Sequence, residues 1–266
     1  MSVSLSVAVM AHPKRRHFVA ELTAALDVEA PVVWDERNDR WDTGRRSLLA
    51  HDPQASHHLV VQDDAVVCRD LAAAAARAAE AAGERPVALY TGRVRPYRAR
   101  VAQAIEGARA AGATWLEMEG PWWGVALVIP TAHIPDLVAW GDGRPDVPNY
   151  DKRIARWYGH QGIACWYSIP SLVDHRSVAE NPSLVPGRTG DRHAHCFIGH
   201  GSSGLDVEWS TWAFRAAQEE RDLRRQVREA RRDQKIQARR LRLEARAARA
   251  ARPRVVSADA GAGNTG

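Results

Sequence analysis

The chain has 266 residues and a mass of 29.4 kDa, enough for one sizeable domain with an appendage or for two small domains. Hydrophobic residues at 45% and charged residues at 26% are ordinary globular values, which excludes wholesale disorder. No apolar run approaches the roughly 20 residues that cross a bilayer, and the first apolar stretch lacks the pattern of a signal peptide. Three scattered cysteines without a CxxC pair argue against a disulfide framework and favour a reducing cytoplasm. We therefore expect a cytoplasmic protein with no membrane partner.

The net charge of +5 is unevenly distributed along the chain. Residues 215–266 hold 15 Lys and Arg against 7 Asp and Glu, a charge of +8, which leaves −3 for the rest. No glycine occurs between Glu208 and Arg252, and Pro253 then ends the run, so one long basic helix is expected. The composition predicts three parts: a body over 1–205, a basic helical tail over 206–254 and a disordered end over 255–266.

Strands and helices are expected to alternate through the body. In chain order, apolar runs predict strands at 3–10, 31–34, 57–62, 87–90, 114–118 and 124–129. Helical spacing and alanine content predict helices over 16–26, 45–50, 71–82 and 98–111, with another opening near residue 151. This order predicts an α/β fold with a mainly parallel sheet flanked by helices. Such sheets bind ligands at the carboxyl ends of their strands.

Two predicted strand ends carry charged residues. The first strand ends in HPKRR just before a helix, where backbone amides and cations suit an anion such as a diphosphate. A simple turn with solvated charges is the alternative. The third strand ends at Asp63 and Asp64, a carboxylate pair that needs a cation or hydrogen-bond donors beside it. Hard oxygen ligands suit Mg²⁺ or Mn²⁺, and a helix N-cap is the alternative role.

The order of HPKRR, VVWDERND, G-x-x-S and HHLVVQDDAVVCRDL resembles the nucleotide-binding half of a GT-A-fold glycosyltransferase. In particular it is similar to small glycosyltransferase-like proteins of actinobacteria and their phages. The resemblance implies a GT-A-like (Rossmann-type) sheet, a nucleotide-sugar donor such as a UDP-sugar, and Mn²⁺ or Mg²⁺ held chiefly by Asp64. It places Asp63 toward the sugar or ribose. The residues that it places along the nucleotide are His12, Pro13, Arg15 and Asp35. The motif here is Gln-Asp-Asp, where the family usually has Asp-x-Asp.

The second half of the body adds an aromatic loop and a candidate base. The segment GPWWGVALVIPTAHI leads into a strand, and Trp122 and Trp123 can form a wall for a sugar ring, with core packing as the alternative. Asp151 lies in the first turn of a predicted helix, where interaction with the helix dipole is the plainer role. The resemblance makes Asp151 the candidate base that activates the acceptor hydroxyl. Asp142 and Asp146 lie nearby and are alternatives.

The resemblance extends over roughly residues 3 to 200 and ends in two further motifs. PSLVDH is similar to the element that closes the catalytic core of these proteins, which implies that His175 completes the metal shell or contacts the diphosphate. The segment RHAHCFIG offers Arg192, His193 and His195 for phosphate contact. His-x-His is also a metal pattern, but with no cysteine or glutamate partner nearby we do not expect a zinc site.

Two classes of function follow. The first is a hexosyltransferase-like enzyme that transfers a sugar from a nucleotide to a macromolecular acceptor, either hydroxymethylated bases in DNA or a phage virion protein, in the host cytoplasm if the chain is phage-encoded. The second is a non-catalytic nucleic-acid-binding or assembly protein on the same scaffold. Charged and histidine residues at several strand ends favour the enzyme, and the basic tail slightly favours DNA as acceptor. A solvated helix is the alternative role for the tail. The sequence does not identify the oligomeric state.

Overall fold

A computed structural model gives the fold of residues 2–93, 98–177, 179–181, 184 and 192–215. The strands within these residues are β1 (Leu5–Ala11), β2 (Val32–Trp34), β3 (His57–Gln62), β4 (Ala65–Val67), β5 (Val87–Ala88), β6 (Trp115–Met118), β7 (Ala126–Pro130), β8 (Cys165–Ser168), β9 (Val173–His175) and β10 (Phe214–Arg215). The α-helices are α1 (Arg16–Leu26), α2 (Arg40–Leu49), α3 (Leu71–Ala82), α4 (Arg98–Ala110), α5 (Ile134–Asp142) and α6 (Tyr150–Gln161). None of the helices described is both long and apolar enough to cross a membrane.

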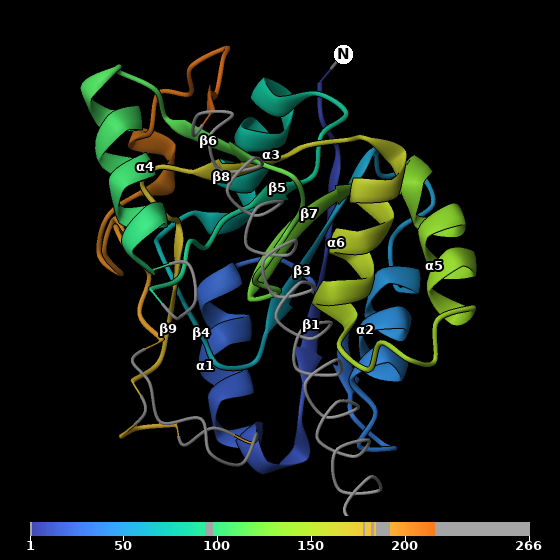
Figure 1. The fold of residues 1–266 in the computed structure, drawn as a ribbon. Coiled ribbons are helices and arrows are strands. Elements are labelled where there is room, and N and C mark those ends of the chain that lie inside the picture. Colours follow the sequence, from blue (N-terminus) through green and yellow to red (C-terminus); the bar gives the residue numbers. More distant parts are fainter. Residues whose placement is uncertain (1, 94–97, 178, 182–183, 185–191, 216–266) are drawn as a thin grey trace, which may run out of the picture. The chain divides into compact units, whose positions relative to one another are not determined.

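The described strands form one large mixed sheet and one small ribbon (Figure 1). The large sheet has the order β10-β6-β8-β5-β7-β3-β1-β2. Its pairs β1–β2, β1–β3, β5–β8 and β6–β10 are parallel, while β3–β7, β5–β7 and β6–β8 are antiparallel. Four of these seven pairs are parallel, so the predicted mainly parallel sheet flanked by helices is confirmed, with antiparallel pairs mixed in at β7 and between β6 and β8.

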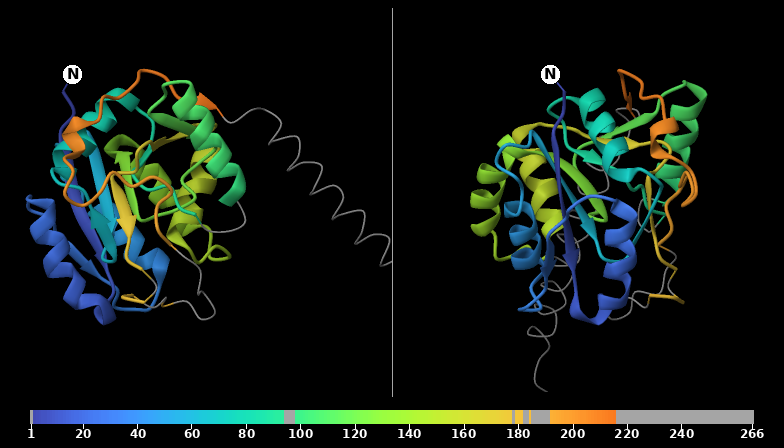
Figure 2. Two further views of the ribbon diagram at one scale, coloured as in Figure 1. Left: turned by 90° about the vertical axis from the view of Figure 1, so that its left-hand side faces the viewer. Right: turned by 180° about the vertical axis from the view of Figure 1, so that it is seen from behind.

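Helices cover both faces of the sheet (Figures 1 and 2). Side chains along β3 alternate between the two faces: Leu59 and Val61 join the hydrophobic cluster that contains residues of α1 and α3, while Val60 joins the cluster of α2, α4, α5 and α6. In β7, Val128 and Ile129 divide in the same way. Strands buried on both faces are rich in apolar residues, as the central residues Leu59, Val60 and Val61 of β3 are.

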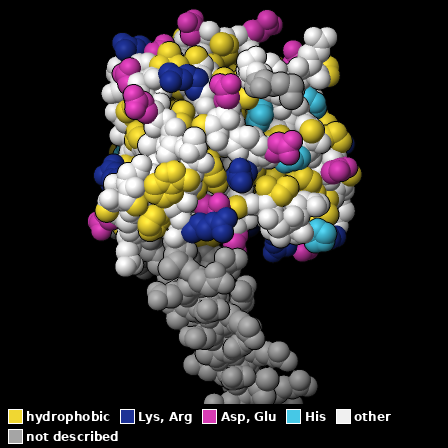
Figure 3. Space-filling model, turned by 90° about the horizontal axis from the view of Figure 1, so that it is seen from above, with side chains coloured by type: hydrophobic (Ala, Val, Ile, Leu, Met, Phe, Trp, Pro, Cys, Tyr) yellow, Lys and Arg dark blue, Asp and Glu magenta, His cyan; other side chains and the backbone are white. Residues whose placement is uncertain are grey.

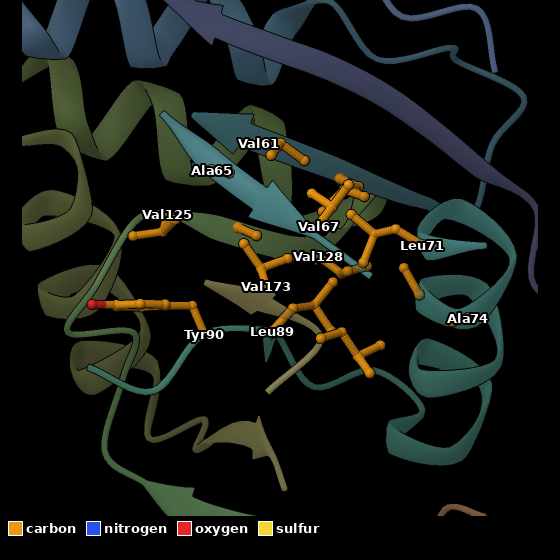
Figure 4. Close-up of a cluster of buried hydrophobic side chains, with 14 of the residues drawn as sticks. Val61, Ala65, Val67, Leu71, Ala74, Leu89, Tyr90, Val125, Val128 and Val173 are labelled. Atoms are coloured by element: carbon orange, nitrogen blue, oxygen red, sulfur yellow. The ribbon is translucent and has the colours of Figure 1, made fainter. Parts of the chain in front are cut away.

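The small ribbon pairs β4 with β9 and packs on the cluster that contains α1 and α3 (Figure 4). Ala65 pairs with His175, and Val67 with Val173, in an antiparallel register. Val67 and Val173 are 2% and 0% exposed. Burial of each such side chain contributes on the order of 2 kcal/mol, so the ribbon is firmly attached to the sheet. This attachment matters because β4 begins directly after Asp64.

Four elements within the body were not expected from the sequence, and one helix begins earlier than expected. The short strands β4, β8 and β9 and helix α5 are additional. Helix α2 starts at Arg40 rather than at residue 45 because Asp39 caps it, accepting hydrogen bonds from the backbone N–H groups of Trp41 at 2.8 Å and Asp42 at 3.1 Å. The buried spacing of Ile134, Leu137 and Val138 in α5 was a helical signal available in the sequence.

The end of the body differs from the prediction. A helix was expected from Glu208, but residues 207–213 are irregular and Phe214–Arg215 forms strand β10 beside β6. Trp209 stacks on the fully buried Trp115 with ring centroids 4.3 Å apart, and Ser210 accepts a hydrogen bond from the Trp115 indole through its carbonyl oxygen. These aromatic contacts outweigh local helix propensity. The rest of the predicted tail, and the predicted disordered end over 255–266, lie outside the described residues.

One buried histidine makes the stability of the body depend on pH. His58 in β3 is fully buried, with Nδ1 2.8 Å from the Ser6 hydroxyl and Nε2 2.9 Å from the carbonyl oxygen of Ser47. Burial lowers the pKa of His58 from 6.5 to about 4, so between these values the unfolded chain binds more protons than the folded protein. The contribution of His58 to stability is therefore complete above pH 6.5 and falls by about 3 kcal/mol as the pH drops to 4.

Urea denaturation at a series of pH values tests this expectation. The free energy of unfolding of the wild type should decrease more steeply between pH 6.5 and 4 than that of His58→Gln, so the gap between the two curves should narrow. A gap that stays constant over this range would show that His58 does not titrate on unfolding.

Candidate functional site

The carboxyl ends of the three parallel strands β1, β2 and β3 meet at one edge of the sheet. The N–H of Asp35, just after β2, donates to the carbonyl oxygen of Ala11 at the end of β1, at 2.7 Å. The N–H of Asp63, just after β3, donates to the carbonyl oxygen of Met10 at 3.0 Å. Parallel pairing thus places the charged residues that follow each strand side by side, as the sequence predicted.

Asp63 is buried and is held by the start of the first helical segment. Its carboxylate accepts hydrogen bonds from the backbone N–H of His12 at 2.7 Å and from Nη1 of Arg15 at 3.1 Å. Burial and the adjacent Asp64 carboxylate raise the pKa of Asp63 to about 6, although Arg15 opposes this shift. Asp63 is only 3% exposed, so these contacts compensate a charge that water does not reach.

Asp64 is the most heavily coordinated carboxylate of the site. Its Oδ2 lies 2.5 Å from Nη1 of Arg15, 2.8 Å from Nδ2 of Asn181, 3.3 Å from Nε2 of His175 and 3.6 Å from Nη1 of Arg192. Its other oxygen, Oδ1, is enclosed and has no hydrogen-bond partner among the described residues. A buried carboxylate oxygen without a donor is costly, so this position favours a cation or a donor from a ligand.

The small ribbon brings His175 to Asp64. Because Ala65 pairs with His175, the residue before β4 and the last residue of β9 become neighbours, and the N–H of Arg176 donates to the backbone carbonyl oxygen of Asp64 at 3.1 Å. Burial lowers the pKa of His175, which favours the neutral imidazole. Nδ1 of His175 lies 3.3 Å from the carbonyl oxygen of Arg176 and can donate to it, which leaves the Nε2 lone pair directed at the site.

These donors fit a divalent cation that is shared with a phosphate. A carboxylate oxygen of Asp64 and Nε2 of His175 are 3.3 Å apart, a spacing that two ligands of one cation can adopt. The carboxylate with the unpartnered Oδ1 and the neutral imidazole are the chemistry that Mn²⁺ accepts. Among the described residues, no group of three or more His, Cys, Asp and Glu side chains is arranged to hold a metal ion, so substrate oxygens would have to complete the shell.

The predicted nucleotide residues lie at the same edge with different contacts. His12 caps the short 3-10 helix that begins at Pro13, accepting through Nδ1 from the N–H of Lys14 at 3.1 Å. Burial lowers the pKa of His12, against the opposing charge of Asp35. Asp35 accepts from the N–H groups of two following residues, so it also shapes the turn after β2. Pro13 is exposed at the start of this turn.

The predicted sugar wall belongs to an aromatic cluster next to His175. The ring of Trp123 is edge-on to Tyr90 at 6.2 Å and to Tyr167 at 5.9 Å, and Tyr90 is edge-on to His175 at 6.3 Å. Trp122 lies 6.1 Å from Trp123 and donates its backbone N–H to the Tyr167 hydroxyl. Both tryptophans are partly exposed. They pack against the cluster and also present aromatic surface to solvent.

Tyr150, the residue before Asp151, links the start of α6 to the end of β3 and to the aromatic loop. The Tyr150 hydroxyl donates to the carbonyl oxygen of Gly124, in the aromatic loop, and accepts from Nε2 of Gln62, the last residue of β3, at 3.3 Å. Asp151 is partly exposed in the first turn of α6, and its Oδ1 lies 2.8 Å from the N–H of Lys152. The helix thus begins between the end of β3 and the aromatic loop.

The two alternative bases have other partners. Asp142 accepts from the Trp41 indole at 2.8 Å and pairs with Arg45 at 3.0 Å, which is a structural role. Asp146 lies 3.7 Å from Arg156 on the surface. Neither contact links these aspartates to Asp64.

Of the three residues near 192–195 that were predicted to contact phosphate, one contacts Asp64 and two do not. Arg192 reaches Asp64, and it also donates to the carbonyl oxygen of Asn181 and contacts Nε2 of His175 at 3.3 Å. His193 turns instead to Asp174, 2.9 Å from its carboxylate. His195 lies toward the charges of α4, and burial lowers its pKa. The structure therefore joins Arg192 to the site but does not place His193 or His195 on Asp64.

Asn181 was not expected from the sequence. It is 3% exposed, lies 117 positions after Asp64 and donates to its carboxylate at 2.8 Å. An asparagine in a polar loop gives no local signal of such a contact. The link between Gln62 and Tyr150 was likewise not visible, since it depends on how α6 packs against the sheet.

The chain resembles known proteins only distantly. No protein-family model matches it, and no curated protein matches it. One solved structure with a detectable match is a mutant of Drosophila beta-1,4-galactosyltransferase 7 in complex with manganese, UDP-Gal and xylobiose. The identity is 10%, the TM-score is 0.32, and the match covers 77% of this chain and 85% of the other. The functional interpretation must therefore come from the residues of this site.

Proposed function

We propose that this protein is a nucleotide-sugar-dependent glycosyltransferase that moves a sugar to a hydroxyl group of a macromolecular acceptor. The observation that carries the proposal is the convergence of Asp63 and Asp64 with Arg15, Arg192 and His175 at the carboxyl ends of parallel strands. Buried carboxylates compensated by guanidinium groups suit a ligand that combines a diphosphate with sugar hydroxyls. The order of sequence motifs makes a UDP-sugar the first donor to test.

Each part of the donor has candidate partners. Arg15 and Arg192 present guanidinium groups that can bind diphosphate oxygens in a bidentate manner. The enclosed Asp63 can accept from a sugar or ribose hydroxyl, and Trp123 offers an aromatic surface for the sugar ring. His12, Pro13 and Asp35, at the ends of β1 and β2, are the proposed neighbours of the nucleoside.

A divalent cation, Mn²⁺ or Mg²⁺, bound through Asp64 and His175 would neutralise the diphosphate as it leaves. The rest of the proposed chemistry belongs to the chain. The acceptor oxygen forms a bond to the anomeric carbon, the bond from that carbon to the diphosphate oxygen breaks, and the acceptor proton passes to Asp151. Arg15 and Arg192 stabilise the negative charge that grows on the departing diphosphate.

The first experiment asks whether a nucleotide sugar binds at all. We expect UDP-sugars with Mn²⁺ to raise the melting temperature of the protein, because a ligand that binds only the folded state stabilises it. Turnover should then appear in a panel of nucleotide sugars offered with hydroxymethylated DNA or with virion proteins. If no nucleotide sugar shifts the melting temperature, the second candidate is favoured: a non-catalytic nucleic-acid-binding or assembly protein, for which the basic tail is the specific support.

DNA with hydroxymethylated bases is the acceptor that the tail slightly favours. On the face seen in Figure 3, acidic and basic side chains of the described residues are interspersed, and residues 1–214 carry a net charge of −3. A long duplex would therefore gain affinity mainly through residues 215–266, with their charge of +8. Virion protein is the other proposed acceptor.

Deleting residues 217–266 separates these acceptors. The cut keeps β10, including the 2.7 Å ion pair between Arg215 and Glu117, so the body should fold and bind its nucleotide sugar. If DNA is the acceptor, the KM for long duplexes should rise by at least about tenfold, and binding should depend less on salt because phosphate contacts are lost. Transfer to a very short oligonucleotide, which cannot reach the tail, is the control. Equal DNA affinity of the full-length and shortened proteins at low salt would remove the reason to prefer DNA.

A further inference from the structure

Two guanidinium groups lie next to Oδ2 of Asp64, the carboxylate oxygen that faces His175. Nη1 of Arg15 lies between the two carboxylates, 3.1 Å from Oδ1 of Asp63 and 2.5 Å from Oδ2 of Asp64. Nη1 of Arg192 lies between the other pair of ligand atoms, 3.6 Å from Oδ2 of Asp64 and 3.3 Å from Nε2 of His175. Each arginine thus bridges two groups in the way that a metal ion bridges its ligands.

Arg192 lies beside the close contact between His175 and Asp64. Nε2 of His175 and Oδ2 of Asp64 are 3.3 Å apart, and Nη1 of Arg192 is 3.3 Å from the first atom and 3.6 Å from the second. Its positive charge is therefore set against the buried carboxylate. The segment of Arg192 is held by a hydrogen bond from its guanidinium group to the carbonyl oxygen of Asn181, and by one from the Tyr90 hydroxyl to the carbonyl oxygen of Arg192.

The balance of charges at the site indicates what must bind together with a divalent cation before Arg15 and Arg192 leave Asp64. Two carboxylates and two guanidinium groups compensate one another, and the carboxylate side chains are 4% and 1% exposed. A divalent cation added alone would leave a buried excess of positive charge, which a low-dielectric site penalises. A diphosphate brings at least two negative charges and offers both guanidinium groups new bidentate partners.

We infer that Arg15 and Arg192 act as internal counter-ions that keep a divalent cation off Asp64 until a nucleoside diphosphate binds and draws them away. The inference rests on the proposed function and adds to it an order of binding, nucleotide before metal. Because coupling between two ligands is reciprocal, the factor by which UDP raises the affinity for Mn²⁺ must equal the factor by which Mn²⁺ raises the affinity for UDP.

Isothermal titration calorimetry of the full-length protein tests this order without any substitution. Mn²⁺ is titrated with and without saturating UDP, and UDP with and without saturating Mn²⁺. We expect the affinity for Mn²⁺ to be at least tenfold higher with UDP present, and the two coupling factors to agree. If UDP binds but leaves the affinity for Mn²⁺ unchanged, the inferred coupling is overturned.

Two variants ask whether the charge of the arginines is responsible. Arg192→Ala removes one counter-ion while Arg15 still compensates the carboxylates, so the fold should persist; Arg15→Ala is the harsher second variant. In the absence of nucleotide, Arg192→Ala should bind Mn²⁺ at least tenfold more tightly than the wild type. Asn181→Ala, which removes a neutral donor from the same Asp64 oxygen, should have a smaller effect. Arg16→Ala is the matched control, since Arg16 is exposed and lies over the Trp34 ring at 5.1 Å.

The outcomes separate this inference from the proposed function. If UDP binds to no variant with or without Mn²⁺, the proposed function fails, yet the comparison of wild type with Arg192→Ala still tests the counter-ions. If UDP binds but Mn²⁺ affinity is the same in the wild type, Arg192→Ala and Arg16→Ala, the counter-ion role is wrong while the transferase proposal stands.

Discussion

Replacing Asp64 with Asn is expected to abolish sugar transfer while leaving the protein folded. The amide keeps the shape of the carboxylate but removes the charge that holds Arg15, Arg192 and the proposed cation. Removing one electrostatic contact to a leaving group typically lowers kcat at least about a hundredfold. Asp64→Ala should be as damaging. The rate of transfer with saturating UDP-sugar and Mn²⁺ is the measurement, and circular dichroism checks the fold.

Asp52 provides the control for this experiment. It lies on the surface before the other end of β3, where its Oδ1 accepts from the N–H of Gln54 at 2.8 Å. Asp52→Asn removes the same charge and should leave transfer unchanged. Full activity in Asp64→Asn would show that the carboxylate at the centre of this site does not take part in the reaction.

Asp151→Asn is expected to lower kcat by about a hundredfold to ten-thousandfold, the range of a lost general base. The KM for the nucleotide sugar should change little, because the strand-end contacts to the donor remain. Asp146→Asn is the matched control, since this nearby aspartate is exposed and pairs with Arg156 on the surface. A variant that binds the donor more weakly but turns over normally would make Asp151 a binding residue instead.

Much of the candidate site could be predicted because it depends on local pattern. The strand β3 has the predicted bounds, and a strand that ends in Asp63 and Asp64 places both carboxylates at the sheet edge. Parallel strands β1, β2 and β3 end at the same edge, so His12, Asp35 and Asp63 were expected together and are found together. Apolar runs and the sequence order of charged motifs are sufficient for this part.

The remaining contacts depend on pairings between distant segments that no local pattern contains. Strands were expected at the positions of β6 and β7. That β7 runs antiparallel to β3, and β6 antiparallel to β8, follows from where the connecting segments cross the sheet. A helix was predicted after Glu208, but the chain forms β10 there. Packing of the Trp209 and Phe214 side chains against the body stabilises the chain more than local helix formation would. Local propensity is weak beside such packing.

By itself, the sequence determined the α/β class, the strand-end carboxylates and the candidate residues His175, Arg192 and Asp151. Only the tertiary structure decided which of them meet. The β4–β9 register sets His175 beside Asp64, and the loop that follows adds Asn181 and Arg192 to the same oxygen. The physical reason is burial: a carboxylate that is 1% exposed must find its compensating donors within the fold, and those donors come from whichever segments the packing brings near.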